Sequence, residues 1–191
     1  MQEIIEQLKS DLNDKEQELL LNDVDITNLP EANGENPIHT ALLVASKLGL
    51  NIEERDIVSA ERVGARRISA ADPVTTPGLL PIRPRRLVVR LARRDLRDRM
   101  LASARSRRGA TSADLDLPGP PMRFYVNERL TKQNGQLFRQ AREIGNRLGW
   151  KYIWTRRGRI LARQKPGDSV CLIRSEVDLR QIFETPTKSC K

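Results

Sequence analysis

The octapeptide RRLVVRLA at residues 85–92 alternates its side chains with a period of two, which is the repeat of a β-strand. In an extended chain Leu87, Val89 and Leu91 face one way, and Arg86 and Arg90 face the other. One apolar face and one basic face indicate a strand whose sheet is packed against a core on one side. The strand therefore needs further strands beside it and helices beneath it.

The segments around it supply both. Alternating or β-branched runs predict strands at 20–31, 56–64 and 122–127, and apolar positions at helical spacing predict helices at 36–49 and 95–105. The helix at 36 begins with Asn36-Pro37, a favourable start. The order β-α-β-β-α-β is that of the ferredoxin-like plan, an antiparallel sheet with two helices on one face, which RNA-recognition modules also use. We expect an α+β protein.

Residues 3–20 predict a separate helix. Ile5, Leu8, Leu12 and Leu19 follow the spacing of a coiled coil, with Lys15 at one seam position. Under three heptads is short, so this is a coiled-coil stub that we expect to self-associate as a dimer or trimer. The alternative is a single amphipathic helix that lies on its own domain.

A second α/β region begins near residue 128. Thr131 can cap a helix that ends at Gly149, and a hairpin at 152–163, a strand at 170–173 and a helix at 175–183 follow. The predicted organisation is a coiled-coil helix at 1–20, an RNA-recognition-like domain at 21–127, a small C-terminal domain at 128–184 and a tail at 185–191. Residues 65–84 contain four prolines and are expected to be a mobile loop.

Charge is unevenly distributed. Residues 1–61 carry a net charge of −10 and residues 83–165 a net charge of +17, within a chain of net +9. Of the 23 basic residues in 83–165, 20 are arginine, which grips phosphate with two parallel hydrogen bonds and stacks on bases. This indicates a polyanionic partner for the basic body. The alternative is a solvated surface that only keeps the chain soluble.

The strand RRLVVRLA lacks the aromatic pair with which an RNA-recognition module stacks bases. Arginine contacts to the backbone are therefore expected to dominate. Tyr152 and Trp154 share one face of the hairpin and either could stack a base, although Trp154 could equally belong to the core. Arg157-Gly158 fits a tight turn, with Ile153 and Leu161 as candidates for its core face. The candidate nucleic-acid-binding residues are Arg86, Arg90, Arg97, Arg123, Arg129, Lys132, Arg139, Arg142, Lys151, Tyr152, Trp154, Arg156, Arg157, Arg159 and Arg163.

No catalytic, metal or cofactor site is expected. The two cysteines lack zinc-site spacing, no glycine-rich phosphate loop occurs, and the acidic pairs Asp95/Asp98 and Asp114/Asp116 each lack a third ligand. A magnesium-dependent nuclease is the weak enzymatic alternative that these pairs leave open. With no apolar run long enough for a membrane helix, we expect a non-enzymatic cytoplasmic or nuclear protein that does not insert into membranes.

Two stretches resemble known families. FYVNERLTKQNGQLFRQAREIGNRLGWKYIWTRRGRILARQ with VCLIRSEVDLRQI resembles the conserved domain of the baculovirus few-polyhedra (FP) protein and its lepidopteran, transposon-derived relatives. DVDITNLPE with RRLVVRLARRDLRDRMLASAR resembles the central domain of the first open reading frame protein of LINE-type retrotransposons. The similarity covers roughly residues 20–184.

These resemblances imply a function. The LINE relatives are trimeric, RNA-binding chaperones, which implies a clamp on single-stranded nucleic acid lined by Arg86 and Arg90 and by the hairpin arginines. The expectation is a single-stranded RNA- or DNA-binding protein of retroelement or viral ancestry. The alternative is an oligomeric adaptor of the FP type, which acts through protein partners in occlusion-body formation or virion envelopment.

Overall fold

A computed structural model describes residues 2–32, 34–64, 67–68, 82–107, 109–117 and 120–184. Within these residues the chain folds as the expected α+β mixture of helices and antiparallel sheets. It divides into two compact units. The central unit is Asn22–Asn127, and the terminal unit joins Met1–Leu21 to the chain from Glu128 onward.

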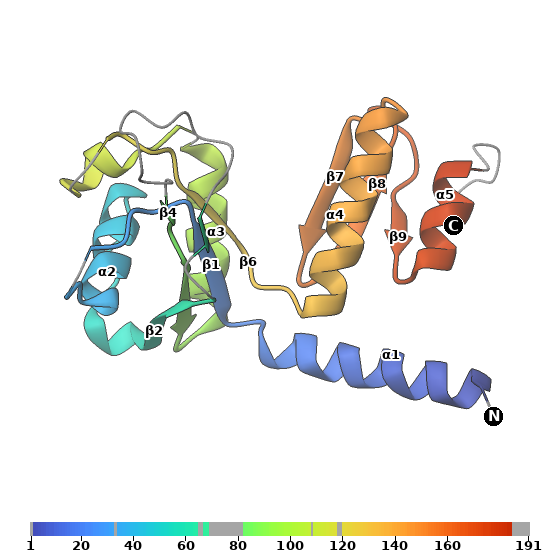
Figure 1. Cartoon of the computed structure of the whole chain (residues 1–191), viewed down its shortest axis with the longest axis horizontal. Coiled ribbons are helices and arrows are strands. Elements are labelled where there is room, and N and C mark those ends of the chain that lie inside the picture. The colour runs from blue at the N-terminus through green and yellow to red at the C-terminus, as the bar shows by residue number, and fades with distance from the viewer. Residues whose placement is uncertain are drawn as a thin grey trace. The chain divides into compact units, whose positions relative to one another are not determined.

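The central unit holds a four-stranded sheet in the order β2-β5-β1-β6 (Figure 1). Its elements along the chain are β1 (Asp23–Thr27), α2 (Pro37–Lys47), β2 (Ile57–Val63), β5 (Arg86–Leu91), α3 (Arg94–Ser106) and β6 (Tyr125–Glu128). Short 3₁₀ turns, η1 (Glu54–Asp56) and η2 (Ser112–Leu115), precede β2 and β6. Both the element order and the strand order are those of the predicted ferredoxin-like plan.

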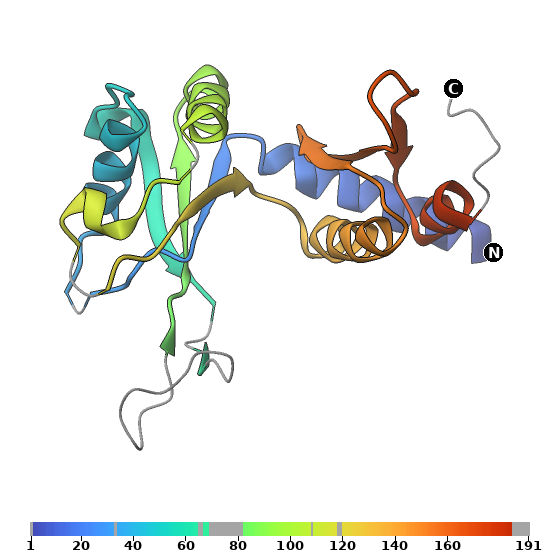
Figure 2. The ribbon, with the colours of Figure 1, turned by 90° about the horizontal axis from the view of Figure 1, so that it is seen from above.

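The core of this unit lies between one sheet face and the two helices, which Figure 2 shows on the same side of the strands. The alternation in RRLVVRLA selects that face, because Leu87, Val89 and Leu91 are all buried in the core while Arg86 and Arg90 lie on the opposite face. Val24 of β1 sits opposite Val89 in the antiparallel register and joins the same core. The predicted period of two is therefore confirmed for the central strand.

Arg62 of β2 fixes the segment that follows β1. Its five N–H donors are all used: Nε and Nη2 bond the Glu35 carboxylate, and the remaining donors bond the carbonyls of Leu29, Pro30 and Arg85 at 2.7–2.9 Å. The Arg62 side chain is almost fully buried. A guanidinium in this position ties the loop after β1 to the start of β5.

Part of the loop expected at 65–84 is described. Residues Arg67–Ile68 (β3) and Ile82–Arg83 (β4) form a short antiparallel pair. Residues 65–66 and 69–81 of that expected mobile loop, and the tail at 185–191, lie outside the described residues.

The terminal unit contains a three-stranded antiparallel sheet, β7 (Tyr152–Arg156), β8 (Arg159–Arg163) and β9 (Cys171–Ile173). Helix α4 (Lys132–Arg147) packs along β7 and β8, and α5 (Glu176–Glu184) packs beside β9 (Figure 1). The Thr131 hydroxyl accepts the Asn134 N–H at 3.1 Å and the Ser175 hydroxyl accepts the Asp178 N–H at 3.2 Å. Both predicted helix starts are thus confirmed. The core is formed by Leu137, Ala141, Ile160, Ala162, Ile173, Leu179 and Phe183.

Helix α1 (Gln2–Leu19) belongs to the terminal unit. Its predicted apolar stripe, Ile5, Leu8, Leu12 and Leu19, is exposed. Asn13 and Gln17 are instead its buried residues within the described part of the helix. The helix therefore lies on its own unit, as the alternative expected, but polar side chains make that contact and the apolar stripe does not.

Candidate nucleic-acid interface

Helices α4 and α5 both pack on one face of the terminal sheet, so neither of them covers the other face. Ile160 and Ala162 of β8 point into the helical core, so Arg159, Leu161 and Arg163 lie on the other face. In the antiparallel register Tyr152, Trp154 and Arg156 of β7 stand directly opposite Arg163, Leu161 and Arg159, and Leu172 of β9 stands opposite Leu161. We call these seven residues the outer face. The structure thus brings together five of the predicted binding residues.

The aromatic residues of the outer face are partly exposed. Trp154 is not part of the core, which instead takes Trp150, edge-to-face with Phe183 at a ring-centroid distance of 4.7 Å. The hypothesis of a core Trp154 is therefore not supported. The Arg163 guanidinium lies 4.8 Å from the centre of the Tyr152 ring, a cation–π contact that holds both side chains in place.

The hairpin tip is a two-residue turn. Arg157 and Gly158 both have positive φ, at 54° and 75°, as a type I′ turn requires. The side chains of Arg156, Arg157 and Arg159 are exposed, and none of them takes part in an ion pair within the described chain. We call these three residues the tip arginines. The prediction of exposed arginines around a glycine turn is confirmed.

The hairpin register corrects one expectation. Because the turn holds only Arg157 and Gly158, Arg156 pairs with Arg159, and Ile153 pairs with Ala162. Leu161 therefore lies on the outer face and is not a core residue, and Ile160 and Ala162 take the core positions.

A buried carboxylate binds the backbone of the turn. The Arg157 and Gly158 N–H groups donate to the two oxygens of Glu128, at 2.8 and 3.0 Å. The N–H groups of the turn are thus already bound to a carboxylate of this chain, that of Glu128. The guanidinium groups of the tip arginines remain exposed. The role of Glu128 was not predicted from the sequence. The signal for it is the scarcity of acidic residues in this region, since only Glu128 and Glu143 occur between 117 and 167.

The remaining predicted residues of this unit are not all gathered at the outer face. Lys132, Arg139 and Arg142 are exposed on α4, whose Leu137 and Ala141 pack against the inner face of the sheet. They therefore lie across the unit from the outer face. Arg129 and Lys151 flank α4 and β7 respectively, with Arg129 partly buried and Lys151 exposed.

The predicted arginines of the central sheet face are paired with buried carboxylates. Arg90 bonds both oxygens of Asp23, at 2.7 and 3.1 Å, and Arg86 bonds Asp25 at 2.9 Å. The hydrogen bond from Arg90 to Asp23 raises the pKa of Arg90. Each pair is neutral overall, which weakens the attraction of this face for phosphate. The alternating acidic residues in DVDIT are the sequence signal for this pairing: Asp23 stands opposite Arg90, and Asp25 stands opposite Val88, two residues from Arg86.

Arg97 requires a correction. It was expected among the surface arginines, but its side chain is only 2% exposed, in contact with Asp98 at 2.7 Å. On α3 it follows the core residue Leu96 and precedes Met100, so its side chain falls at the buried edge of the helix. In this conformation Arg97 is not available to a phosphate.

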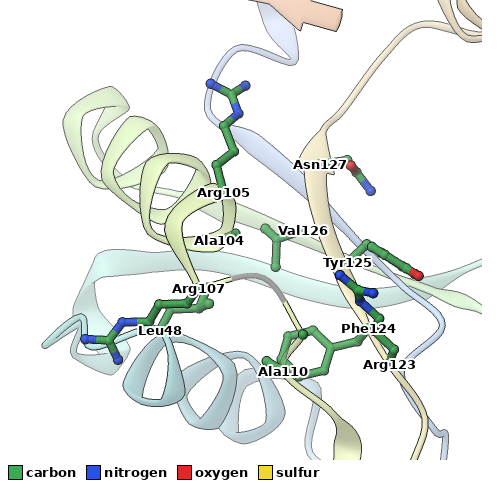
Figure 3. Close-up of a pocket in the computed structure, with 11 residues that line it drawn as sticks. Leu48, Ala104, Arg105, Arg107, Ala110, Arg123, Phe124, Tyr125, Val126 and Asn127 are labelled. Carbon is green, nitrogen blue, oxygen red and sulfur yellow. The ribbon is translucent and has the colours of Figure 1, made fainter. Parts of the chain in front are cut away.

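The central unit has a cavity of about 330 Å³ beside β6 (Figure 3). Apolar side chains, including Phe124 and Val126, line it together with Arg105, Arg107 and Arg123. The Arg107 guanidinium donates to the Lys47 carbonyl at 3.0 Å, and Arg123 lies 5.5 Å from the centre of the Tyr125 ring. Arg123 was predicted as a binding residue, whereas Arg105 and Arg107 were missed. Figure 3 shows the guanidinium groups of Arg105 and Arg107 pointing away from Phe124 and Val126, so the charges of these two arginines do not converge on the apolar lining.

Asp114, a member of one of the two acidic pairs, has structural partners. Asp114 accepts the Thr111 N–H at 2.7 Å and pairs with Lys47 at 2.9 Å. The Thr111 N–H, followed by Lys47, lowers the pKa of Asp114 to about 2. Across the described ranges no group of three or more histidine, cysteine or acidic side chains is placed to hold a metal ion. Among the helices that are described, none is long and apolar enough to span a membrane.

Comparison with models of protein families gives a match in the terminal unit. Residues 131–183 match the family model described as baculovirus FP protein domain 2, which covers α4, the hairpin, β9 and nearly all of α5. No curated protein matches the chain. The resemblance of the central unit to the retrotransposon protein is not shown by this match. Over residues 131–183, this chain is therefore similar to the second domain of the baculovirus FP protein.

Proposed function

We propose that this chain is a non-enzymatic protein that binds single-stranded RNA or DNA mainly through the outer face of the terminal unit. The observation that carries the proposal is the arrangement of that face. Tyr152 and Trp154 stand side by side with exposed arginines at the tip and Arg163 behind them. Aromatic rings that stack bases, bordered by guanidinium groups that reach phosphates, are the pattern of sequence-tolerant single-strand binding.

The cavity beside β6 offers a second contact in the central unit. Its apolar side chains, with Arg123 against the Tyr125 ring, would accept a base with its phosphate. The sheet face with Arg86 and Arg90 is a weaker candidate, because Asp25 and Asp23 neutralise these arginines. We therefore assign the outer face the main role.

The test removes the tip arginines together. Arg156→Ala, Arg157→Ala and Arg159→Ala in one variant should lower affinity for a fluorescent single strand by roughly a hundredfold at low salt, since three charged contacts contribute about 1 kcal/mol or more each. The slope of log affinity against log salt should become shallower by about 2, at about 0.7 per lost phosphate contact. Because the side chains are exposed, the melting temperature should change little.

A matched control separates position from net charge. Lys132→Ala, Arg139→Ala and Arg142→Ala remove the same charge from the exposed side of α4. This variant should lose less than about tenfold in affinity, through reduced long-range attraction alone. Equal losses in both variants would show that binding follows net charge, and no loss in either would refute the proposed function.

A second candidate function rests on α1. Its stripe of Ile5, Leu8, Leu12 and Leu19 is exposed at coiled-coil spacing, which favours self-association of the chain as a dimer or trimer. An oligomeric adaptor of the FP type, acting through protein partners, would use this stripe and would not need the outer face. Nucleic acid that co-purifies with the protein, seen as a raised 260/280 nm absorbance ratio, would favour the binding function over the adaptor.

A further inference from the structure

The side of α1 that meets the terminal unit is polar. Asn13 and Gln17, one helical turn apart, are each 7% exposed, although residues on either side of them are open to solvent. Burial of two amide side chains is favourable only when their donors and acceptors are used. Their partners therefore show what this side of the helix recognises.

Gln17 bonds the chain that leads into α4. Its Oε1 accepts the Thr131 N–H and an Asn134 amide N–H, both at 3.1 Å, and its Nε2 donates to the Arg129 carbonyl at 2.9 Å. One side chain thus satisfies two backbone groups and one side-chain donor.

Asn13 completes the contact one turn earlier. Its Oδ1 accepts the Thr131 hydroxyl at 2.7 Å, and its Nδ2 donates to Asn134 Oδ1 at 3.0 Å. Thr131 also caps α4, because its hydroxyl oxygen accepts the Asn134 N–H. The amides of α1 therefore bind the first turn of α4 through its cap.

The same network reaches the hairpin tip. Asn134 donates to the Gly158 carbonyl at 3.2 Å, and the Gly158 N–H is held by Glu128. Gly158 lies so close to α1 that an added Cβ would fall 2.3 Å from Gln17 Cγ. Gln17, Asn134 and Glu128 together form the seat of the turn that carries the tip arginines.

We propose that Asn13 and Gln17 are positioning residues, which dock α1 against the α4 cap and the hairpin turn and so hold the tip arginines in a fixed arrangement for nucleic-acid binding. The proposal rests on the proposed function of the outer face and extends that function to α1, which has no residue in the outer face. The docked side of α1 lies about 130° around the axis from the apolar stripe, at 100° per residue. The helix can therefore dock on its own unit and contact a second copy of the chain at the same time. Self-association and the positioning of the tip arginines then depend on the same helix.

The test compares two glutamines of the same helix. Gln17→Ala removes the three docking hydrogen bonds of Gln17 and leaves those of Asn13, while Gln7→Ala removes only an exposed contact to Asp11 at 2.8 Å. Amide hydrogen exchange measured by NMR in the full chain should accelerate at Thr131 and Gly158 in Gln17→Ala, by about tenfold or more, and not in Gln7→Ala. Equal exchange rates in the two variants would overturn the docking of α1 by Gln17.

A double-mutant cycle tests the positioning role. Gln17→Ala alone should weaken binding of a fluorescent single strand by roughly three- to tenfold, the cost of ordering the tip on binding. Combined with alanine at the three tip arginines, Gln17→Ala should weaken binding no further, because the groups it positions are gone. An additive effect in the combined variant would indicate a merely structural role and overturn the proposal.

The two proposals fail in different ways. If the unaltered chain binds no single strand, the proposed function fails and the positioning role fails with it, while exchange at Thr131 still decides whether α1 docks. If the unaltered chain binds and Gln17→Ala binds equally well, the outer face stands and the positioning role is refuted.

Discussion

Removal of the Glu128 carboxylate should destabilise the terminal unit more than removal of Glu143, the other acidic residue between 128 and 165. Glu128 is buried and accepts the N–H groups of Arg157 and Gly158. In Glu128→Ala both donors lose their acceptor. The Gly158 donor is buried, so water replaces the lost oxygen poorly there, whereas the Arg157 donor lies nearer to solvent.

The magnitude follows from the two bonds. A hydrogen bond to a charged group contributes about 1.5–3 kcal/mol, and the donor left in solvent recovers part of its share. We therefore expect Glu128→Ala to lower the free energy of unfolding by about 3 kcal/mol. Glu128→Gln keeps one acceptor but turns an amide N–H toward the other donor, so about half of that loss is expected.

The assay uses the position of the tryptophans. Trp150 and Trp154 are the only two in the chain, and both lie in the terminal unit. Tryptophan fluorescence during urea unfolding of the full chain therefore reports on this unit separately from the central unit. Glu143→Gln, at an exposed position of α4, is the matched control and should change stability by less than about 0.5 kcal/mol.

The result that would refute the reasoning is a small effect. A loss below about 1 kcal/mol in Glu128→Ala, close to that of the control, would mean that the carboxylate does not hold the turn. The tip would then be seated by the amide contacts alone.

Three further changes test other parts of the structure. Leu8→Asp with Leu12→Asp, at side chains 62% and 60% exposed, should abolish self-association in analytical ultracentrifugation without lowering stability; an unchanged mass would remove the coiled-coil role. Arg62→Ala leaves Glu35 and three carbonyls without their donor and should destabilise the central unit by about 3–5 kcal/mol, seen as faster amide exchange across β1 and β5. The pKa of Asp114, about 2, lies below its unfolded value of 3.8. The ionised Asp114 therefore contributes to the stability of the folded chain above pH 4, and this contribution is lost as the pH falls toward 2. Asp114→Asn should therefore be less stable than the parent at pH 5 and equal to it near pH 2, and a difference that persists at pH 2 would contradict the assignment.

Local patterns in the sequence were enough for the elements and for much of the core. The period of two in 85–92 placed Leu87, Val89 and Leu91 in the core, because a strand's side chains alternate whatever surrounds it. Helix starts were equally readable, since the caps at Asn36 and Thr131 act within their own first turn. The order of these elements then restricted the sheet to the ferredoxin-like arrangement that the structure has.

Tertiary contacts decided which charges remain available for binding. Whether Arg90 faces solvent or Asp23, and whether Glu128 is a surface acid or binds the backbone of a turn, depends on residues 29 or more positions away along the chain. The same holds for α1, whose polar contacts through Asn13 and Gln17 have no periodic signature in the sequence. A sequence specifies local periodicity directly, but buried polar pairs form only where the folded backbone brings donor and acceptor within about 3 Å. The fold could therefore be read from the chain, whereas the arrangement of the candidate interface required the structure.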